Sequence, residues 1–261
     1  MDQSSRRPLG RTGLNLAPVG FGAFKIGRNE ATKYDVSYDL PDDAACEALL
    51  EEVLEMGIDL IDTAPAYGSS EARIGRLLRD RRDEFILSTK VGETFEHGVG
   101  RFDFSSRSID ESITRSLRRL GTDRLDLVFI HSDGNDIAII EEGAALETLV
   151  RRREQGHLRC IGFSGKTVEG HLRAIETGVV ECLMVEYHAL DESQRGVIDA
   201  AEAAGVGVLV KKGLASGRLD PATAIPHCLQ PTGVASVVIG SLTASHLRDN
   251  LAIARAAIAR P

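Results

Sequence analysis

The chain has 261 residues, of which 43% are hydrophobic and 27% charged, an ordinary composition for a globular protein. Its net charge of −8 argues against a nucleic-acid-binding protein, because contact with phosphates requires a basic surface. The N-terminal segment MDQSSRRPLG has no apolar stretch suited to export, and no segment approaches the length of a membrane span, so we expect a cytoplasmic protein.

Strand and helix patterns alternate along the chain after a short N-terminal hairpin. The hairpin is expected in PLGRTGLNLA, with its turn at residues 11–13, where it could plug the bottom of a barrel. Apolar stripes at helical spacing predict helices over residues 42–56, 109–120, 146–150 and 243–259. Short apolar strands are expected at residues 19–22, 59–61, 85–90, 125–131, 158–163, 182–187, 206–211 and 237–240.

Eight such units favour an α/β fold, a closed (β/α)8 TIM barrel that forms a single domain over residues 1–261. The competing architecture is an open doubly wound sheet, which carries G-x-G-x-x-G in its first turn. Here the first turn reads GFGAFKIG, whose glycines have a different spacing, and no helix follows at once. We therefore prefer the barrel.

The four cysteines are predicted to be buried, reduced thiols. None of them forms a C-x-x-C pair, and Cys160 and Cys182 fall within apolar strands. The seven histidines show no metal-ligand spacing, so we expect no metal site. The arginine-rich runs at residues 79–82 and 151–153 lie at expected helix ends, and we interpret them as solvated charges near helix C-termini.

The most informative residues follow the second, third and fourth predicted strands. Asp62 stands where the second strand stops being apolar, and Tyr67 lies in the loop just after it. Lys90 and His131 end the next two strands. Each residue alone has an ordinary explanation as a cap, a covering ring, a solvated amine or a structural histidine. Because functional groups of a barrel gather at the C-terminal ends of its strands, the three strands together indicate an active site.

Two long loops, residues 23–41 and 91–105, are expected at the same end of the barrel. Their side chains could line a substrate pocket or pack against one another within each loop. The residues concerned are Phe24, Tyr34, Tyr38, Phe95, His97, Arg101, Phe102 and Phe104.

Nearly the whole chain resembles the aldo-keto reductase family. The matching segments run from PLGRTGLNLAPVGFG through IDTAPAYGSSEARIG, LSTKVG, LDLVFIHSDG, CIGFSGKT, VEYH and VKKGLASG to IGSLTASHLRDN. The resemblance implies a barrel that binds a nicotinamide cofactor without a Rossmann motif and transfers hydride between the cofactor and a small carbonyl or alcohol. It implies NADP as the cofactor, with NAD possible.

By this resemblance, Tyr67 would donate the proton during reduction, and the Lys90 ammonium would stabilise the phenolate that remains. Asp62 would pair with Lys90 and fix its position. His131 would hydrogen-bond the substrate oxygen, where negative charge develops as hydride arrives.

The cofactor residues match the family in part. Ser164 matches the serine that would hold the nicotinamide carboxamide. Gly165 replaces the usual asparagine, Met184 the usual glutamine, and Lys211 the aromatic residue expected to stack on the nicotinamide. The rest of the cofactor would meet Gly213, Leu214, Ser216, Gly217, Gly240, Ser241, His246, Asp249 and Asn250. Because NADP-preferring members commonly carry a lysine and an arginine at Gly240 and His246, we expect at most a modest preference for NADPH.

Two other functions remain open on the residues alone. Lys90 beside an acid could form a Schiff base, as in an aldolase, although the order of Tyr67, Lys90 and His131 argues against it. The altered nicotinamide residues also fit a non-catalytic subunit that binds the cofactor and senses redox state. We expect a monomer or a small homo-oligomer without a nucleic-acid or membrane partner.

Overall fold

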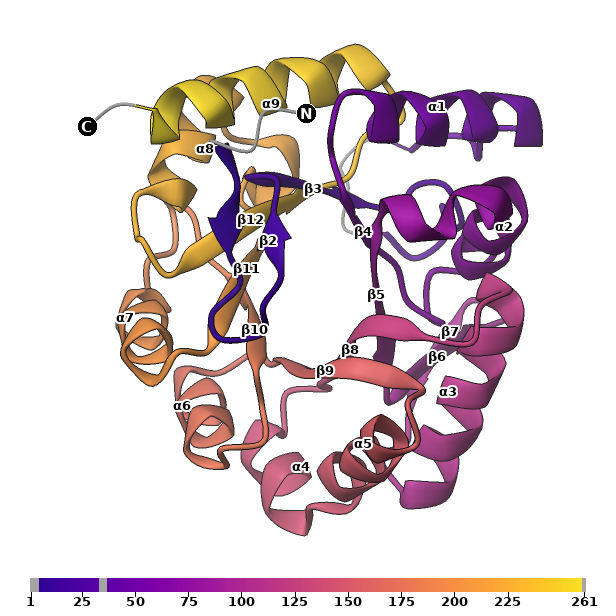
Figure 1. Ribbon diagram of the computed structural model, residues 1–261, viewed down its shortest axis with the longest axis vertical. Helices are drawn as coiled ribbons and strands as arrows, with labels where there is room; N and C mark the ends of the chain where they lie inside the picture. Colours follow the sequence, from indigo (N-terminus) through magenta and orange to yellow (C-terminus); the bar gives the residue numbers. More distant parts are fainter. Residues whose placement is uncertain (1–4, 33–36, 260–261) are drawn as a thin grey trace.

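In the computed structural model, which describes residues 5–32 and 37–259, eight parallel strands close into a barrel (Figure 1). Each barrel strand pairs with the next barrel strand along the chain, and the last barrel strand pairs with the first. The barrel strands are β3 (Val19–Gly22), β4 (Leu60–Asp62), β5 (Ile86–Val91), β8 (Leu125–His131), β9 (Leu158–Ser164), β10 (Cys182–Glu186), β11 (Gly207–Lys211) and β12 (Val234–Ile239). The predicted barrel is confirmed, although β12 begins earlier than the expected strand at residues 237–240.

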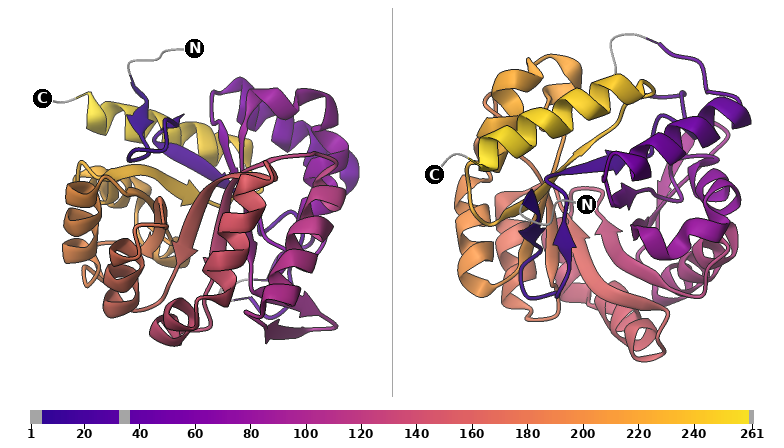
Figure 2. Two further views of the ribbon diagram at one scale, coloured as in Figure 1. Left: turned by 60° about the horizontal axis from the view of Figure 1, so that its bottom comes forward. Right: turned by 45° about the horizontal axis from the view of Figure 1, so that its top comes forward.

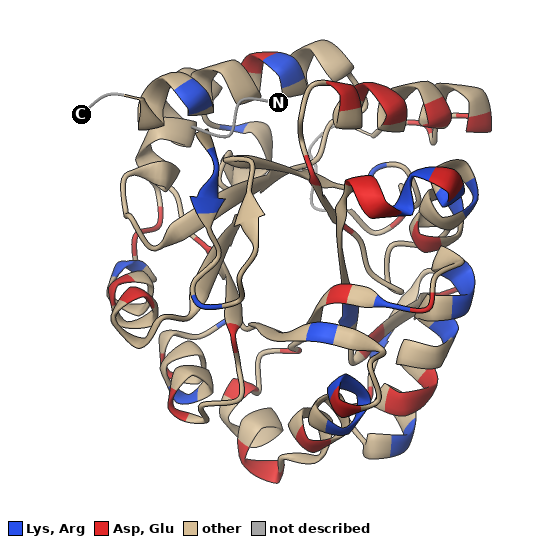
Figure 3. Cartoon of the chain, viewed as in Figure 1, with Lys and Arg blue, Asp and Glu red and all other residues tan. Residues whose placement is uncertain are grey.

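A ring of helices covers the outside of the barrel, and these helices carry many of the charged residues (Figures 1 and 3). The α-helices are α1 (Asp43–Glu55), α2 (Ser70–Leu77), α3 (Ser106–Leu120), α4 (Asp136–Glu142), α5 (Ala144–Glu154), α6 (Val168–Glu176), α7 (Arg195–Ala204), α8 (Pro221–Leu229) and α9 (Ala244–Ile258). None of the helices in the described part of the chain combines the length and apolar character needed to cross a membrane.

The apolar stripe predicted within residues 42–56 forms the buried face of α1. Its members are Cys46, Leu49, Leu50, Val53 and Leu54. Asp42 begins the helix, because its carboxylate accepts a hydrogen bond from the Ala45 N–H at 2.8 Å. The other helices pack in the same way, so one apolar layer fills the space between the strands and the helix ring. All four cysteines are buried free thiols, as predicted.

The N-terminal hairpin closes the bottom of the barrel. Strands β1 (Arg7–Pro8) and β2 (Asn15–Leu16) pair antiparallel, and both views of Figure 2 place them at one end of the barrel. Leu9, Leu14 and Leu16 are buried in one cluster with side chains that fill the barrel interior. The opposite end, where the strands terminate, is left for the functional site.

The expected loop at residues 91–105 contains a second hairpin, which the sequence analysis missed. Strands β6 (Glu93–Glu96) and β7 (Val99–Phe102) pair antiparallel around His97 and Gly98. Both turn residues have positive φ, 52° and 78°, as a two-residue hairpin turn requires. Asn-Gly or Asp-Gly would have announced this turn, whereas His-Gly is a weaker signal.

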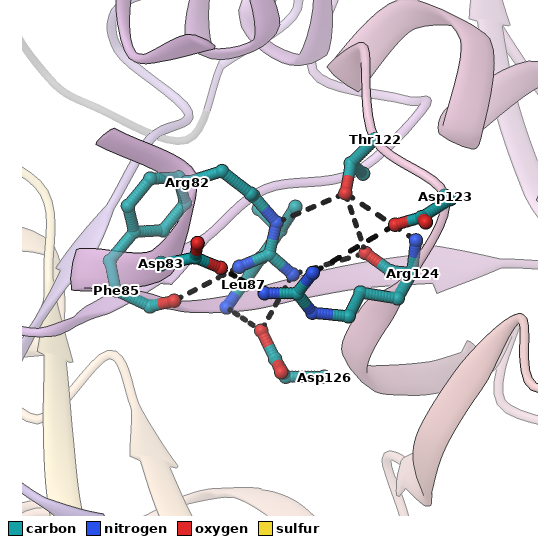
Figure 4. Close-up of polar contacts among 8 residues, drawn as sticks. All are labelled: Arg82, Asp83, Phe85, Leu87, Thr122, Asp123, Arg124 and Asp126. Atoms are coloured by element: carbon teal, nitrogen blue, oxygen red, sulfur yellow. Dashed lines mark hydrogen bonds and ion pairs between the residues drawn. The ribbon is translucent and has the colours of Figure 1, made fainter. Parts of the chain in front are cut away.

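The interpretation of the arginine runs was wrong for two of their members. Figure 4 shows Arg82 enclosed at the start of β5 and β8, where its Nη2 donates to Asp126 Oδ2 at 2.8 Å. The same carboxylate oxygen accepts from the Leu87 N–H at 2.8 Å. Arg82 is half-buried and Arg152 is buried. Arg152 Nε donates to Asp110 Oδ1 at 2.8 Å. These guanidinium groups join neighbouring elements, since an arginine stem can be buried while its nitrogens are paired.

Helices α2 and α3 approach so closely that only glycine fits at position 75. A Cβ atom there would lie 2.3 Å from Arg119 O and 2.5 Å from the Leu120 backbone. We expect Gly75→Ala to lower the free energy of unfolding by about 1–3 kcal/mol in urea denaturation, because backbone atoms would have to shift. Gly196→Ala on α7 is the matched control: nothing lies within 4 Å of its Cβ position, so no loss is expected. Equal effects of the two substitutions would contradict the steric explanation.

Candidate active site

The ends of β4 and β5 hold a buried ion pair. Lys90 Nζ donates to Asp62 Oδ1 at 2.8 Å and to Oδ2 at 2.7 Å, and a third bond reaches Thr63 O at 2.9 Å. Asp62 also accepts a hydrogen bond from Ser88 Oγ at 2.8 Å. All protons of the ammonium therefore have acceptors, which compensates for its removal from water.

The ring of Tyr67 lies directly beside this ammonium. Lys90 Nζ is 4.8 Å from the ring centre of Tyr67, and the ring of His131 lies edge-on at 6.5 Å between centroids. Phe24, from the loop after β3, meets the Tyr67 ring edge-on at 5.1 Å. The structure thus brings together all four residues that were predicted from the strand ends.

The loop that carries Tyr67 is held by close backbone contacts. Ser70 Oγ donates to Ala23 O at 2.8 Å, which ties the start of α2 to the loop after β3. A Cβ atom at Gly27 would lie 2.2 Å from Tyr67 O, so the two loops can meet only because residue 27 is a glycine. These contacts fix the backbone of the loop that carries Tyr67.

Burial and charge act in opposite directions on these groups. Burial raises the pKa of Tyr67 above its ordinary value, and the Lys90 charge opposes this effect only in part. Burial disfavours the charge of Lys90, yet the Asp62 carboxylate and the Tyr67 phenol raise its pKa on balance. At neutral pH the site accordingly holds a protonated phenol beside an ammonium.

Glu93, at the start of the β6–β7 hairpin, contacts His131 and was missed from the sequence. Its Oε2 lies 2.7 Å from His131 Nδ1. The imidazole ring is not oriented for a regular hydrogen bond, so His131 Nδ1 has no hydrogen-bond partner among the described residues. Burial lowers the pKa of His131, and Glu93 counteracts this shift. A carboxylate attracts a proton on Nδ1, so the neutral imidazole would present an unprotonated Nε2. Only the hairpin brings Glu93 there, and that hairpin was not predicted.

A cavity of about 430 Å³ opens at the C-terminal ends of the strands. It is lined by Asp62, Tyr67, Lys90 and His131, and on its other side by Ser164, Gly165, Met184 and Lys211. A second cavity of about 170 Å³ adjoins it and shares Lys212, Val238 and Gly240 with the first. The shared residues place the two cavities next to each other.

Lys211 reaches across the barrel mouth into the larger cavity. It ends β11, and its Nζ donates to Ser164 Oγ at 2.9 Å and to Gly165 O at 3.0 Å, both at the end of β9. Burial lowers the pKa of Lys211 to about 7, and the nearby charges of Lys212 and Lys90 act in the same direction. A planar ring expected at this position is thus replaced by an amine that hydrogen-bonds Ser164.

The smaller cavity is lined by the predicted loop after β11. Gly213, Leu214, Ser216 and Gly217 all contribute to it. Ala215, Ser216 and Gly217 follow one another with positive φ values of 46°, 61° and 94°. The N–H groups of Ala215 and Gly217 donate to Lys212 O and Leu214 O within this turn. Lys25 and Lys212 line the same cavity and supply positive charge around it.

Among the residues predicted at the far end of the cofactor, Gly240 lines both cavities. Ser241, His246, Asp249 and Asn250 lie on or before α9 and line neither cavity. Ser241 Oγ accepts a hydrogen bond from the Thr243 N–H at 3.1 Å. His246 and Asp249 are exposed and Asn250 is buried. Arg248 turns towards α1 and pairs with Glu52 at 2.9 Å.

The residues that line the two cavities fit the nicotinamide and pyrophosphate parts of a dinucleotide. The larger one holds a serine hydroxyl beside an acid, a phenol, an ammonium and an imidazole. The smaller one offers glycine backbone and cations to a pyrophosphate. Lys211 departs from this fit, because it occupies the position where an aromatic side chain was expected to stack on the nicotinamide ring. No group of three or more metal-ligating side chains occurs among the described residues.

His171 supports the wall of the cavity as a neutral imidazole. Its Nε2 accepts from the Gly165 N–H at 3.1 Å, and its Nδ1 lies 2.9 Å from Gln194 Oε1. Burial lowers its pKa to about 4. The unfolded chain, whose histidine pKa is higher, then binds the proton first, so this contribution to stability is complete at neutral pH and is lost as pH falls towards 4.

We expect His171 to account for roughly 3 kcal/mol of the stability that is lost on acidification from neutral pH to about pH 4. Urea denaturation of the wild type and of His171→Asn at several pH values measures this difference, because other titrating groups cancel between the two proteins. Parallel stability–pH curves for both proteins would refute the assignment.

Residues 18–224 match the model of the Aldo/keto reductase family. The chain is 28% identical to L-galactose dehydrogenase of Arabidopsis thaliana over 97% of this chain and 88% of that protein. It is 29% identical to D-threo-aldose 1-dehydrogenase of a Pseudomonas species over 79% and 68%. A solved structure from Pseudomonas aeruginosa, described as an aldo-keto reductase, superimposes with a TM-score of 0.90 at 42% identity, covering 98% and 97% of the two chains.

Proposed function

The chain belongs to the aldo/keto reductase family, and on that basis we propose that it uses NAD(P)H to reduce an aldehyde or ketone to an alcohol. The observation that carries this proposal is the buried Lys90–Asp62 pair beside the protonated phenol of Tyr67, at the wall of one cavity. Such an arrangement can deliver a proton to a carbonyl oxygen and stabilise the phenolate that remains.

In this proposal the nicotinamide, when bound, supplies the hydride. Tyr67 donates its proton to the carbonyl oxygen, and the adjacent Lys90 ammonium lowers the cost of the phenolate. Asp62 holds Lys90 in place and keeps it charged. The hydrogen bonds are formed before the substrate arrives, so the site has little to reorganise during the reaction.

His131 orients the substrate oxygen. A neutral His131 that carries its proton on Nδ1, 2.7 Å from Glu93 Oε2, would accept a hydrogen bond from the alcohol hydroxyl through Nε2. A protonated His131 would donate from Nε2 to the carbonyl oxygen. The Glu93 carboxylate favours this form, but burial opposes it more strongly and lowers the pKa of His131 on balance. Glu93 thus serves as a positioning residue for this histidine.

The Schiff-base alternative at Lys90 is disfavoured on the same geometry. An amine must be neutral to attack a carbonyl, whereas both oxygens of Asp62 hold Lys90 as an ammonium. Treatment with borohydride and an aldehyde should therefore leave Lys90 without an adduct in mass spectrometry, and a trapped adduct on Lys90 would favour the aldolase.

A fluorescence titration with NADPH and NADH tests the proposal directly. We expect both nucleotides to bind, followed by oxidation of the bound nucleotide in the presence of a suitable aldehyde. Aldoses and methylglyoxal form a reasonable panel, because similar proteins are named for such substrates. Absence of binding for both nucleotides would refute the proposed function, and binding without any turnover would favour the redox-sensing alternative.

The preference for NADPH is expected to be modest and to depend on His246. The 2′-phosphate is best held by fixed cations, but Arg248 is paired with Glu52, and Ser241 offers a neutral hydroxyl. Fluorescence titrations should show that His246→Arg strengthens NADPH binding at neutral pH and leaves NADH binding within a few-fold. A strong wild-type preference that survives His246→Ala would place the charge on another residue.

A further inference from the structure

Lys211 is a half-buried amine that the proposed proton transfer does not use. Its side chain passes from the end of β11 to the end of β9, where it donates to Ser164 Oγ and to Gly165 O. Because Lys211 Nζ donates the hydrogen bond to Ser164 Oγ, the Ser164 hydroxyl can still donate its own proton to a ligand. Any ligand group that accepts from Ser164 must then lie close to Lys211 Nζ, since the two atoms are 2.9 Å apart.

The charged groups around Lys211 already have ion-pair or hydrogen-bond partners of their own. Lys90 on β5 is held by Asp62, and Lys212 pairs with Glu186 on β10. Asp136 on α4 accepts from the N–H groups of Lys166 and Thr167, and from the hydroxyls of Ser132 and Thr167. The titratable rings that face Lys211 are His131 on β8 and His171 on α6, and burial holds the pKa of both below the usual value.

Resting on the proposed function, we propose that Lys211 distinguishes the oxidised from the reduced nicotinamide and makes this discrimination depend on pH. The oxidised ring carries a positive charge and the reduced ring is neutral. An ammonium beside Ser164 therefore repels the oxidised ring and tolerates the reduced one. During carbonyl reduction the cofactor leaves in its oxidised form, so the charge on Lys211 would promote release of that product.

The direction of the pH effect follows from proton linkage. The pKa of Lys211 is lowered to about 7 by burial, so the amine gains its proton as pH falls through neutrality. The oxidised cofactor binds better to the neutral amine, and its affinity must decrease over the same range. From about pH 8 to about pH 6, the Kd of NAD+ should rise roughly tenfold relative to that of NADH.

The experiment measures both dissociation constants across this pH range by fluorescence titration of NADH and its displacement by NAD+. These nucleotides lack the 2′-phosphate, whose own titration would otherwise contribute. Calorimetry of NAD+ binding in buffers of different ionisation enthalpy should show release of about half a proton at neutral pH. This readout requires only the wild-type protein.

Two substitutions separate the charge of Lys211 from its other contacts. Lys211→Met keeps a flexible stem without an amine and should make the ratio of the two Kd values independent of pH. Lys211→Arg keeps the charge throughout and should hold the ratio at its high, acidic value, because arginine does not lose its proton in this range. A flat ratio in the wild type, or an unchanged slope in Lys211→Met, would overturn the inference while leaving the proposed function intact. Failure of both nucleotides to bind would instead remove the proposed function itself.

Discussion

Replacing Tyr67 with phenylalanine is expected to lower the rate of carbonyl reduction by a factor of about 10²–10⁴. The ring would still fill its place against Phe24 and His131, so the fold and the cavity should remain. The lost group is the hydroxyl, which is the proton donor of the proposal. Burial raises the pKa of this phenol, so it stays protonated over the neutral range.

Steady-state assays with saturating aldehyde measure the loss, and titration with NADH should show an affinity within a few-fold of the wild type. Tyr187→Phe is the matched control, because it removes a tyrosine hydroxyl outside the larger cavity, where the Tyr187 ring stacks on His227. We expect near wild-type turnover from that variant. Near-normal turnover of Tyr67→Phe would show that another group donates the proton.

The parts that could be predicted from sequence depend on local pattern and on barrel topology. A buried parallel strand is apolar throughout, so the point where a polar residue follows it marks the strand end. Asp62 and His131 are the last residues of β4 and β8, and Lys90 precedes Val91, the last residue of β5. Because parallel strands of one barrel all end on the same face, three sequence positions were enough to predict one site.

The contacts that could not be predicted run between elements that sequence spacing does not relate. Lys211 reaches Ser164 across the end of β10, and the direction of a long side chain is decided by the walls around it. Glu93 reaches His131 only because residues 93–102 form a hairpin, whose His-Gly turn gave little signal. Arg82 was interpreted as solvated because its partner Asp126 belongs to a strand that begins over forty residues later. In each case the missing information was the tertiary neighbour.

Breaking the Lys90–Asp62 pair should destabilise the protein and abolish its activity, and these two effects can be separated. Asp62→Leu leaves a buried ammonium without its carboxylate, so we expect the free energy of unfolding to fall by about 3–5 kcal/mol. Lys90→Met leaves a buried carboxylate that retains the Ser88 hydrogen bond, and its loss should be of similar size. Urea denaturation of each single variant measures the cost of one unpaired buried charge.

The double variant Asp62→Leu/Lys90→Met removes both charges at once. We expect it to recover most of the lost stability, because apolar side chains of similar volume can replace a buried ion pair at little cost. The double-mutant cycle should therefore be strongly non-additive, as the two side chains are in direct contact at 2.7 Å. Turnover should nevertheless stay near background, since no ammonium would remain beside Tyr67 to stabilise its phenolate. Additive losses of stability would mean that the two charges are hydrated independently, and restored turnover in the stable double variant would show that the pair serves only the fold.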